Sequence, residues 1–505
     1  MTEKRFNLVE EPWIPVADQG LVGLHQLFSD SQLRALGGSP LHKIAVMKLL
    51  LAIAQAAHTP DDDNAWQALG QEGLAEACLA YLDRWHDAFW LYGDTPFLQM
   101  PAVAKAKPLP YGALLPDVAS GNTSVLFQTQ RGPDMTDALR AMVLLANMSC
   151  CLSGKKVDNT ISLSPGYKKG ASGEAGPALC SRGLLHSFLQ GDSLLQTVWF
   201  NLMTGADIAS MGVFPAGLGT PPWERMPQGE DCPVANGLRA SLMGRLVPMA
   251  RFMLLLEENA CYVEGLRHLN YLRGNIIDPS AAVDFTDPKK PRALWADPAK
   301  RPWRSLISLL QFVSGTPVGS NKGYWCPLLK SGITRLRQFH IGTFQLWCGG
   351  IKLSSNAGEQ YLTGSDDVVE SEFSLSTEYM TGKYDKWFAS FQHNMELLEG
   401  IGKTLYGAVV GYYKDEKVDT AGDLAAKATH VFWQQAERHA ESLSLACSLD
   451  DPREEETIMR RMLACALKAY DQTCPQATAR QMQVWARHQP RFRLGTATAG
   501  KAKDK

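Results

Sequence analysis

Residues 378–417 read EYMTGKYDKWFASFQHNMELLEGIGKTLYGAVVGYYKDEK, and their apolar positions recur mostly at helical spacing. Three stretches with the same property follow: AGDLAAKATHVFWQQAERHAESLSLA at 421–446, PREEETIMRRMLACALKAYDQTC at 452–474 and ATARQMQVWARHQPRFR at 477–493. The polar breaks between them are short, which is typical of antiparallel helices that pack on each other. We therefore predict a C-terminal four-helix bundle at 381–493 and a flexible tail at 494–505.

The part of the chain before this bundle, residues 1–380, has a different pattern. Its first forty residues alternate short extended runs with prolines, which predicts a small edge hairpin, and residues 41–58 and 72–90 have the periodicity of a packed helical pair. Between about 101 and 300 the sequence is rich in glycine and proline, which indicates long loops of the kind that often carry function. The predicted fold class is α+β: a large mixed α/β N-terminal domain with long irregular loops, plus the helical bundle.

The composition is that of a soluble protein with a large core: of 505 residues, 45% are hydrophobic and 20% are charged. The 50 Lys and Arg against 52 Asp and Glu give a formal net charge of -2, so contact with a nucleic acid would depend on local basic patches. The start, MTEKRFNLVEEPW, lacks the order of a secretory signal, and the longest apolar stretch, near residues 44–57, is too short to cross a bilayer. We expect a cytoplasmic protein without membrane segments, whose eleven scattered cysteines are reduced thiols.

The sequence lacks the common motifs for catalysis and metal binding. EGIGKT at 399–404 departs from a phosphate-binding loop because Leu397 stands where the pattern needs glycine. The eleven histidines form no H-E-x-x-H motif, the cysteines form no C-x-x-C pair, and no serine lies in a G-x-S-x-G elbow. We therefore expect no enzymatic activity, no cofactor and no metal site.

Two stretches have the composition of nucleic-acid contacts. DPKKPRALWADPAKRPWR, residues 287–304, interleaves two tryptophans and two aspartates with six cations: Lys289, Lys290, Arg292, Lys300, Arg301 and Arg304. Such a loop suits a phosphate backbone, and equally well a solvated loop whose tryptophans anchor it to the core. PGYKKG at 165–170 combines lysines with glycines that allow a close backbone approach to a groove, although such a stretch is more often a flexible loop.

Taken in order along the chain, several short stretches resemble the large subunit of the type I-E CRISPR surveillance complex, the CasA family of Cascade. They are NLVEEPWIPV near the start, FWLYGDTPFLQM at 89–100, ASGNTSVLFQTQ at 119–130, the glycine-lysine stretch, WCGGIKLSSNAGEQ at 347–360 and AERHAESL at 436–443. The resemblance covers essentially the whole chain. Many relatives carry a zinc-binding cysteine cluster in the middle of the large domain, whereas that region offers only Cys232 and Cys261 here, with no C-x-x-C pair, so no zinc is expected.

The resemblance implies that loops of the large domain bind DNA. Phe127 would be a stacking or wedging side chain near the 5′ handle of the crRNA and the protospacer-adjacent motif (PAM), beside Gln128, Thr129 and Gln130. The alternative, that Phe127 anchors its own loop to the domain, remains open. The loop formed by Gly166, Tyr167, Lys168, Lys169 and Gly170 would enter the minor groove of the PAM, where readout is permissive.

Two further loops are implied in the same way. Lys289 or Lys290 would match the groove-reaching lysine of the family. The segment after Gly349-Gly350 would match the wedge, which splits the duplex with a glutamine. Asn356 and Gln360 both fit that role, and Lys352 would contact phosphate.

The resemblance therefore implies a non-enzymatic subunit that recognises the PAM in double-stranded DNA and starts unwinding and R-loop formation, while guide RNA pairing reads the sequence. Its implied partners are the crRNA-containing backbone, handle-binding and small subunits of Cascade, the target DNA, and a helicase-nuclease effector recruited by the large domain. The bundle would help to hold the displaced strand. Two other classes remain open: a metal-dependent nucleic-acid hydrolase, and a helical scaffold that binds only proteins.

Overall fold

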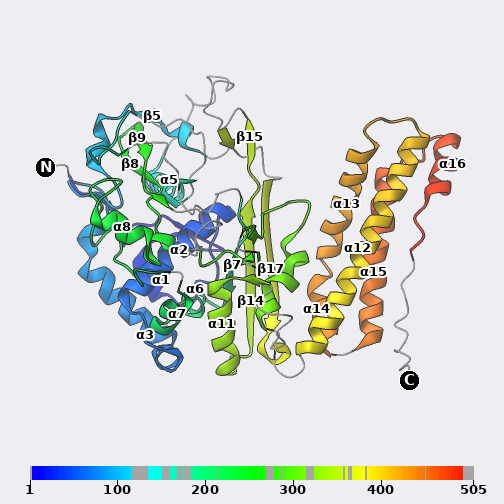
Figure 1. The fold of residues 1–505 in the computed structure, drawn as a ribbon, viewed down its shortest axis with the longest axis horizontal. Helices are drawn as coiled ribbons and strands as arrows, with labels where there is room; N and C mark the ends of the chain where they lie inside the picture. The colour runs from blue at the N-terminus through cyan, green and yellow to red at the C-terminus, as the bar shows by residue number, and fades with distance from the viewer. Residues whose placement is uncertain are drawn as a thin grey trace. The chain divides into compact units, whose positions relative to one another are not determined.

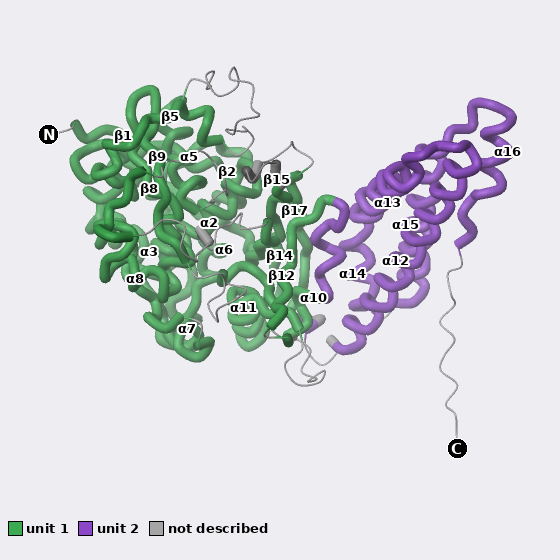
Figure 2. The backbone as a smooth tube through the Cα atoms, turned by 45° about the horizontal axis from the view of Figure 1, so that its top comes forward, with its two compact units in different colours: residues 1–298, 308–377 green, residues 299–307, 378–505 purple. Residues whose placement is uncertain are grey.

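The computed structural model describes residues 3–115, 135–149, 158, 160–167, 174–175, 183–212, 214–268, 278–284, 286–287, 289–313, 323–356, 359–361, 367–380, 384–449 and 451–492. The chain forms two compact units, which Figure 2 draws in different colours. The first unit contains residues 1–298 and 308–377, and the second contains residues 299–307 and 378–505. The second unit therefore includes a short segment from the middle of the chain, which sequence reasoning had assigned to the large domain.

Helices form much of the N-terminal part of the first unit (Figure 1). In chain order the elements are β2 (Ile14–Val16), β3 (Gly20–Val22), α1 (Leu24–Ser29), α2 (Pro40–Ala57) and α3 (Asp63–Arg84). Strands β2 and β3 pair as an antiparallel hairpin, and α2 packs against α3. The predicted hairpin and helical pair are confirmed, although the second helix, α3, covers Asp63–Arg84 rather than 72–90, and Trp90 begins a strand.

Helix α2 lies in the core of the first unit. It starts where the Ser39 hydroxyl accepts a hydrogen bond from the backbone N–H of His42, with Pro40 in the first turn. Among the described residues it is the one helix long and apolar enough to cross a membrane, and 78% of it is buried inside the protein, as in a core helix. The sequence had predicted a stretch too short for this, near 44–57; α2 is longer because it begins at Pro40.

The main sheet of the first unit has three antiparallel strands in the order β17 (Val368–Ser376), β14 (Thr343–Ile351) and β7 (His186–Gln190). Helix α2 packs against β14, and α11 (Pro327–Gln338) packs against β7. Beyond the end of β14 the chain forms a second hairpin, β15 (Ser354–Asn356) and β16 (Glu359–Tyr361), before it returns as β17 (Figure 1). The sheet thus carries the predicted wedge segment at one end.

Short elements complete the first unit. Two pairs of strands form two-stranded sheets: β1 (Arg5–Asn7) with β4 (Trp90–Tyr92), and β10 (Arg267–His268) with β6 (Glu174–Ala175). One three-stranded sheet has the order β5 (Leu109–Pro110), β9 (Asn259–Glu264), β8 (Arg251–Leu255). The other has the order β12 (Arg292–Ala293), β11 (Val283–Asp284), β13 (Tyr324–Trp325). The short helices are α5 (Asp137–Ser149), α6 (Leu194–Phe200), α7 (Gly205–Met211), α8 (Pro233–Arg239) and α9 (Met243–Leu246), and α10 (Leu306–Leu310) begins in the segment that belongs to the second unit.

The second unit is helical. Its helices are α12 (Tyr384–Asp415), α13 (Ala421–Glu437), α14 (Ala440–Leu449), α15 (Pro452–Thr473) and α16 (Ala479–His488). The second predicted helix is divided into α13 and α14 at Arg438 and His439, where the backbone N–H of His439 bonds to the carbonyl of Ala436 in a tight turn. The predicted mixed fold with a helical C-terminal region is therefore confirmed, with this one break added.

Side chains explain why residues 299–307 belong to the second unit. Trp303 is buried and lies edge-on to Trp433, with ring centroids 5.7 Å apart. The guanidinium of Arg304 lies 3.7 Å from the centroid of the Trp433 ring and pairs with Glu399 at 2.5 Å. These contacts bind the segment to α12 and α13.

Candidate nucleic-acid interface

Several predicted contact residues lie outside the described part of the chain. They are Phe127, Gln128, Thr129 and Gln130, which follow the described segment ending at Leu115, and Lys168, Lys169 and Gly170. Their proposed roles stay predictions. The structure does describe the start of the glycine-lysine loop, the Lys289–Lys290 hairpin and the backbone of the wedge hairpin.

A buried carboxylate holds the start of the glycine-lysine loop. Glu230 is fully buried, and its side chain accepts hydrogen bonds from the backbone N–H groups of Leu163 at 3.0 Å and Ser164 at 2.8 Å. The Ser164 hydroxyl accepts a further bond from the N–H of Asp231 at 2.8 Å. Charge-assisted bonds of this kind fix the backbone before it reaches Gly166, whose φ of 74° is in the left-handed region that favours glycine.

The far end of the same loop is tied to the same corner of the unit. Strand β6 pairs with β10 in a register that places Ala175 opposite Arg267. Arg239 donates to the carbonyls of both Glu230 and Arg267, the latter at 2.7 Å, and so joins the two attachment points. Burial raises the pKa of the Tyr167 hydroxyl, against the opposing charges of Arg239 and Arg267. The described edges of the loop are therefore anchored beside two arginines.

Lys289 and Lys290 lie at the tip of a hairpin. Strands β11 and β12 pair with Val283 opposite Ala293, and the Asp287 carboxylate accepts the N–H of Lys289 at 2.9 Å, which shapes the turn. Both lysine side chains are exposed, and neither has an ion-pair partner among the described residues. Two exposed ammonium groups at the tip of a short hairpin suit contact with phosphate.

The rest of the predicted basic stretch does not join them. Arg301 pairs with Glu437 at 2.7 Å, and Arg304 pairs with Glu399 while stacking on Trp433. Arg301, Arg304 and Trp303 therefore anchor this half of the stretch within the second unit, whereas Lys300 is exposed. The six cations therefore do not form a single phosphate-binding patch.

The wedge segment forms a two-stranded ribbon. In the β15–β16 register Asn356 stands opposite Glu359, and Gln360 stands opposite Ser355. Asn356 and Gln360 therefore occupy adjacent register positions, which fall on opposite faces of a pleated ribbon. Lys352 is exposed just before the ribbon, and its backbone N–H donates to the carbonyl of Asp367 at 2.7 Å, which closes the base of the hairpin.

One short segment, Gly183–His186, connects the wedge hairpin with the Lys289–Lys290 hairpin. His186 pairs with Gly349 of β14 and also bridges to Ala281, while Leu184 bridges to Trp295. The N–H of Leu185 donates to the Leu294 carbonyl at 2.9 Å, and the N–H of Ala296 donates to the Gly183 carbonyl at 2.8 Å. We call this segment the junction. It lies between the strand that leads to the wedge hairpin and the strands that carry Lys289 and Lys290.

Behind the junction lies a buried set of charged groups. Lys48 of α2 pairs with Asp278, and both side chains are fully buried. Burial lowers the pKa of Lys48, although the nearby carboxylate of Asp278 acts in the opposite direction. For Asp278, burial acts to raise the pKa, but the charges of Lys48 and His186 outweigh it, so the pKa lies below its ordinary value. Burial also lowers the pKa of His268 to about 3, so this imidazole is neutral at physiological pH. Sequence reasoning missed this set, although Lys48 between the apolar residues 44–47 and 49–54 of α2 was a signal for it.

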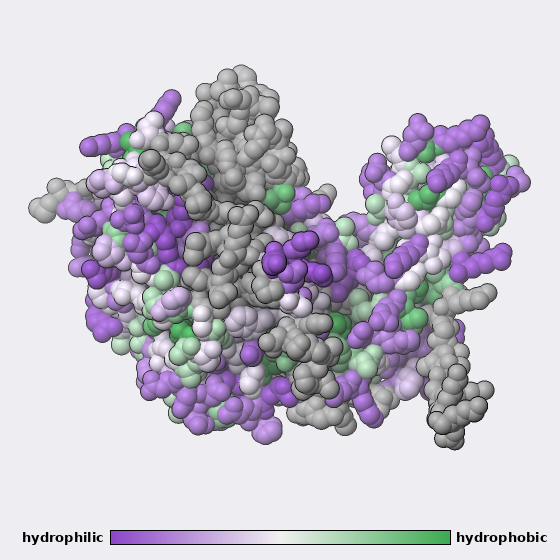
Figure 3. Space-filling view, viewed as in Figure 1, coloured by the Kyte–Doolittle hydropathy of each residue, from purple (hydrophilic) through white to green (hydrophobic). Residues whose placement is uncertain are grey.

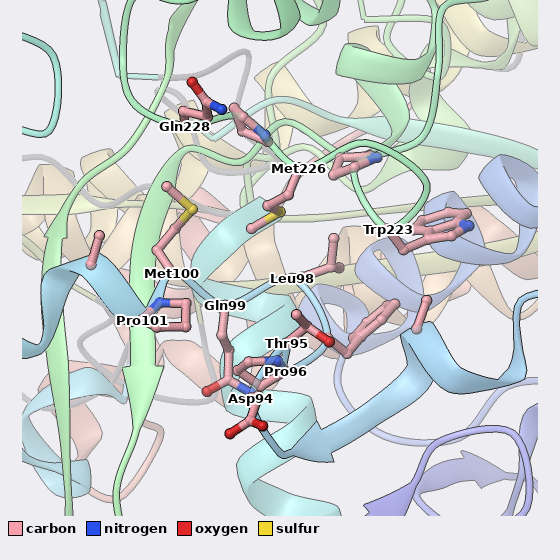
Figure 4. Close-up of a pocket in the computed structure, with 15 residues that line it drawn as sticks. Asp94, Thr95, Pro96, Leu98, Gln99, Met100, Pro101, Trp223, Met226 and Gln228 are labelled. Carbon is pink, nitrogen blue, oxygen red and sulfur yellow. The ribbon is translucent and has the colours of Figure 1, made fainter. Parts of the chain in front are cut away.

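A separate cavity of about 430 Å³ lies in the first unit and is drawn in Figure 4. It is lined by residues 94–102, of which 94–100 belong to the FWLYGDTPFLQM stretch, together with Pro222, Trp223, Met226 and other residues near them. Gln99 in its wall is already used, because its side chain donates to the Leu91 carbonyl at 2.6 Å and accepts from the Leu255 N–H at 2.8 Å. Asp94 is the one ionisable side chain among the lining residues, so they do not provide an acid–base pair.

The surface drawn in Figure 3 is mostly hydrophilic, with small scattered apolar areas. Within the described residues no three His, Cys, Asp or Glu side chains are grouped so that they could hold a metal ion.

Comparisons with known proteins address the family. The model described as CRISPR-associated protein Cse1 matches residues 7–472. A curated relative, CRISPR-associated protein CasA/Cse1 of Thermus thermophilus, is 32% identical over 217 residues, and this match covers 40% of each chain. The chain thus spans about two fifths of the length of that relative.

Solved structures agree with this assignment. The structure of Thermus thermophilus CasA (Cse1) aligns with a TM-score of 0.69 and 20% identity over 96% of this chain and 98% of that one. Cse1 from Acidimicrobium ferrooxidans aligns with a TM-score of 0.68 and 16% identity over 96% of this chain and 99% of that one. A chain of a CRISPR RNA-guided surveillance complex gives a TM-score of 0.64 at 18% identity, over 96% and 98%. These structures share the fold, and the family model matches most of the sequence: the chain belongs to the CRISPR-associated Cse1 family.

Proposed function

We propose that this protein is the non-catalytic large subunit of a type I-E CRISPR surveillance complex, in which it recognises the PAM in double-stranded DNA and starts strand separation. The observation that carries the proposal is the junction. It connects the hairpin of Lys289 and Lys290 with the strand that leads into the wedge hairpin, so a duplex held by one loop would meet the other. Membership of the Cse1 family supports the same role.

Each loop has chemistry that fits one part of this task. Lys289 and Lys290 would hold the phosphate backbone, and the glycine-lysine loop anchored by Glu230 would enter the minor groove. The β15–β16 ribbon would separate the first base pairs beside the motif, which costs a few kcal/mol of stacking per step. Pairing with the guide RNA would then read the sequence and extend the R-loop.

The proposed partners are crRNA and the other subunits of a surveillance complex. A chain with a formal net charge of -2 has little general attraction for DNA, so stable binding would need the assembled complex. We also propose that the first unit recruits a helicase-nuclease, that the helical unit helps to hold the displaced strand, and that the protein acts in the cytoplasm.

The test is a mobility-shift and footprinting experiment on the chain purified with crRNA and its partner subunits. The probe is a duplex that matches the guide, selected from a pool randomised at the flanking positions. Binding that depends on those positions, with permanganate-reactive thymines beside them, is the expected result. Cleavage of the probe by the complex alone would favour the hydrolase alternative. An intact complex with no preference among flanking sequences would favour the protein scaffold.

A further inference from the structure

Two glycines at the junction allow the backbones of neighbouring segments to touch. Gly183 has a φ of 76°, and a Cβ atom at this position would lie 2.6 Å from the carbonyl oxygen of Ile351. A Cβ atom on Gly350 would lie 2.5 Å from the carbonyl oxygen of Leu184 and 2.8 Å from the Cβ of Ala296. Real Cβ atoms essentially never come this close to backbone, so any other residue would push these segments apart.

These contacts lie at the base of the wedge ribbon and at the base of the Lys289–Lys290 hairpin. Ile351 is the last residue of β14, and the wedge ribbon begins three residues later at Ser354. Ala296 follows β12, the returning strand of the Lys289–Lys290 hairpin, and its N–H donates to the Gly183 carbonyl at 2.8 Å. Gly183 therefore touches the base of the ribbon and the base of the lysine hairpin through its own backbone.

The packing around this point leaves little freedom. Leu184, Ala281, Val283 and Ala293 form a buried cluster, and Gly350, like Ile351, belongs to the long β14–β17 ladder. A close-packed interior transmits a displacement of one segment to its neighbours. An added methyl group at Gly183 or Gly350 would thus shift the ribbon relative to the lysine hairpin without touching either loop.

We infer that Gly183 and Gly350 are positioning residues for DNA opening: their backbone contacts set the separation between the lysine hairpin and the wedge ribbon. This inference rests on the proposed function. It assigns a role in unwinding to two residues that do not contact DNA themselves. Duplex opening should depend on this separation, whereas attachment of the complex to the flanking motif should not.

The experiment uses the assembled complex with crRNA and the selected duplex as probe, and compares Gly183→Ala with Gly212→Ala. Gly212 has a φ of 64° but nothing within 4 Å of its Cβ position, so this control carries the backbone strain without the collision. We expect Gly183→Ala to slow opening of the paired duplex about tenfold or more, since misplacing a functional group by about 1 Å has effects of this size. A duplex with a pre-melted bubble beside the motif should restore the rate, and Gly212→Ala should behave as wild type on both probes.

A second variant guards against misfolding of the first. Ala296→Val replaces no glycine and enlarges the side chain that faces Gly350. We expect it to slow opening of the paired duplex as Gly183→Ala does, and the bubbled duplex to restore the rate. Equal loss on paired and bubbled probes, or no loss in either variant, would overturn the inference. A different result would contradict the proposed function itself: the wild-type complex would show no preference among flanking sequences.

Discussion

The ammonium of Lys48 pairs with the carboxylate of Asp278 inside the first unit, and neither side chain has any exposed surface. A buried pair of this kind is costly to break from one side, because the partner that remains is a buried charge without compensation. The pair joins the central helix α2 to the chain just before Ala281, which bridges to the junction.

Replacing Lys48 with methionine should lower the free energy of unfolding by about 3–5 kcal/mol, measured by urea denaturation. The double variant Lys48→Met with Asp278→Asn should recover part of the loss, because it removes the unpaired carboxylate. A double variant less stable than the single one would mean that the pair is not the main interaction of these residues.

Because the pKa of Asp278 is lowered on folding, its stabilising contribution is present above the ordinary pKa of a carboxyl group and is lost as the pH falls through the lowered value.

His268 should make the free energy of unfolding depend on pH between about pH 3 and pH 6.5. Its pKa falls from 6.5 to about 3 on folding, so below pH 6.5 the unfolded chain binds a proton that the folded chain does not. Stability from this group is complete above pH 6.5 and decreases as the pH falls toward 3, by about 1.4 kcal/mol per pH unit. His268→Gln should reduce the slope of unfolding free energy against pH by one proton, while His25→Gln on the exposed face of α1 is the control.

Glu230→Gln should loosen the start of the glycine-lysine loop. The amide keeps the size of the side chain but removes its charge. The Leu163 and Ser164 amides both donate to Oε2 of the carboxylate, so both bonds lose their charge assistance, and bonds to a charged acceptor are roughly twice as strong as those to a neutral one. Hydrogen exchange at these two amides should become faster. Asp231→Asn, whose exposed carboxylate bonds only to Asn236 at 3.1 Å among the described contacts of that side chain, should leave the exchange unchanged.

Lys289→Ala with Lys290→Ala should weaken binding of the complex to duplex DNA. The slope of log affinity against log salt should become shallower by about one to two units, as expected for the loss of one or two phosphate contacts. Lys300→Ala is the matched control, because this exposed lysine comes from the same basic stretch but belongs to the second unit. An unchanged slope in the double variant would show that the hairpin lysines are only solvated.

The register of the wedge ribbon predicts that Asn356→Ala and Gln360→Ala have unequal effects. The two positions fall on opposite faces of the ribbon, so only one can face the base pairs that are being separated. The variant on that face should slow opening of a paired target, and a pre-melted bubble should bypass the defect because the unstacking energy is already supplied. Similar defects in both variants, unrelieved by the bubble, would point to a structural role for the ribbon.

Periodicity was enough to predict the helices of the second unit, and the order of short stretches along the chain was enough to show the resemblance to the family. Neither signal predicted the partners of charged side chains. Lys289 and Arg304 look alike in the sequence, since both lie in the same basic stretch. Lys289, however, is exposed at a hairpin tip with no ion-pair partner among the described residues, whereas Arg304 stacks on Trp433. Glu230 lies in a polar segment that reads as exposed, and only the folded backbone brings Leu163 within reach of its carboxylate. The roles of Phe127 and the residues that follow it stay predictions, because they lie outside the described residues.

The placement of residues 299–307 has a consequence for producing parts of this protein. The chain passes between the two units at 298–299, at 307–308 and at 377–378, so no single cut yields both units complete. A fragment that begins at residue 378 would contain every helix from α12 to α16 but would lack Trp303 and Arg304, leaving Trp433 without its covering and Glu399 without its ion pair. Such a fragment should expose apolar surface and aggregate, whereas one with residues 299–307 joined to its N-terminus through a flexible linker should stay monomeric.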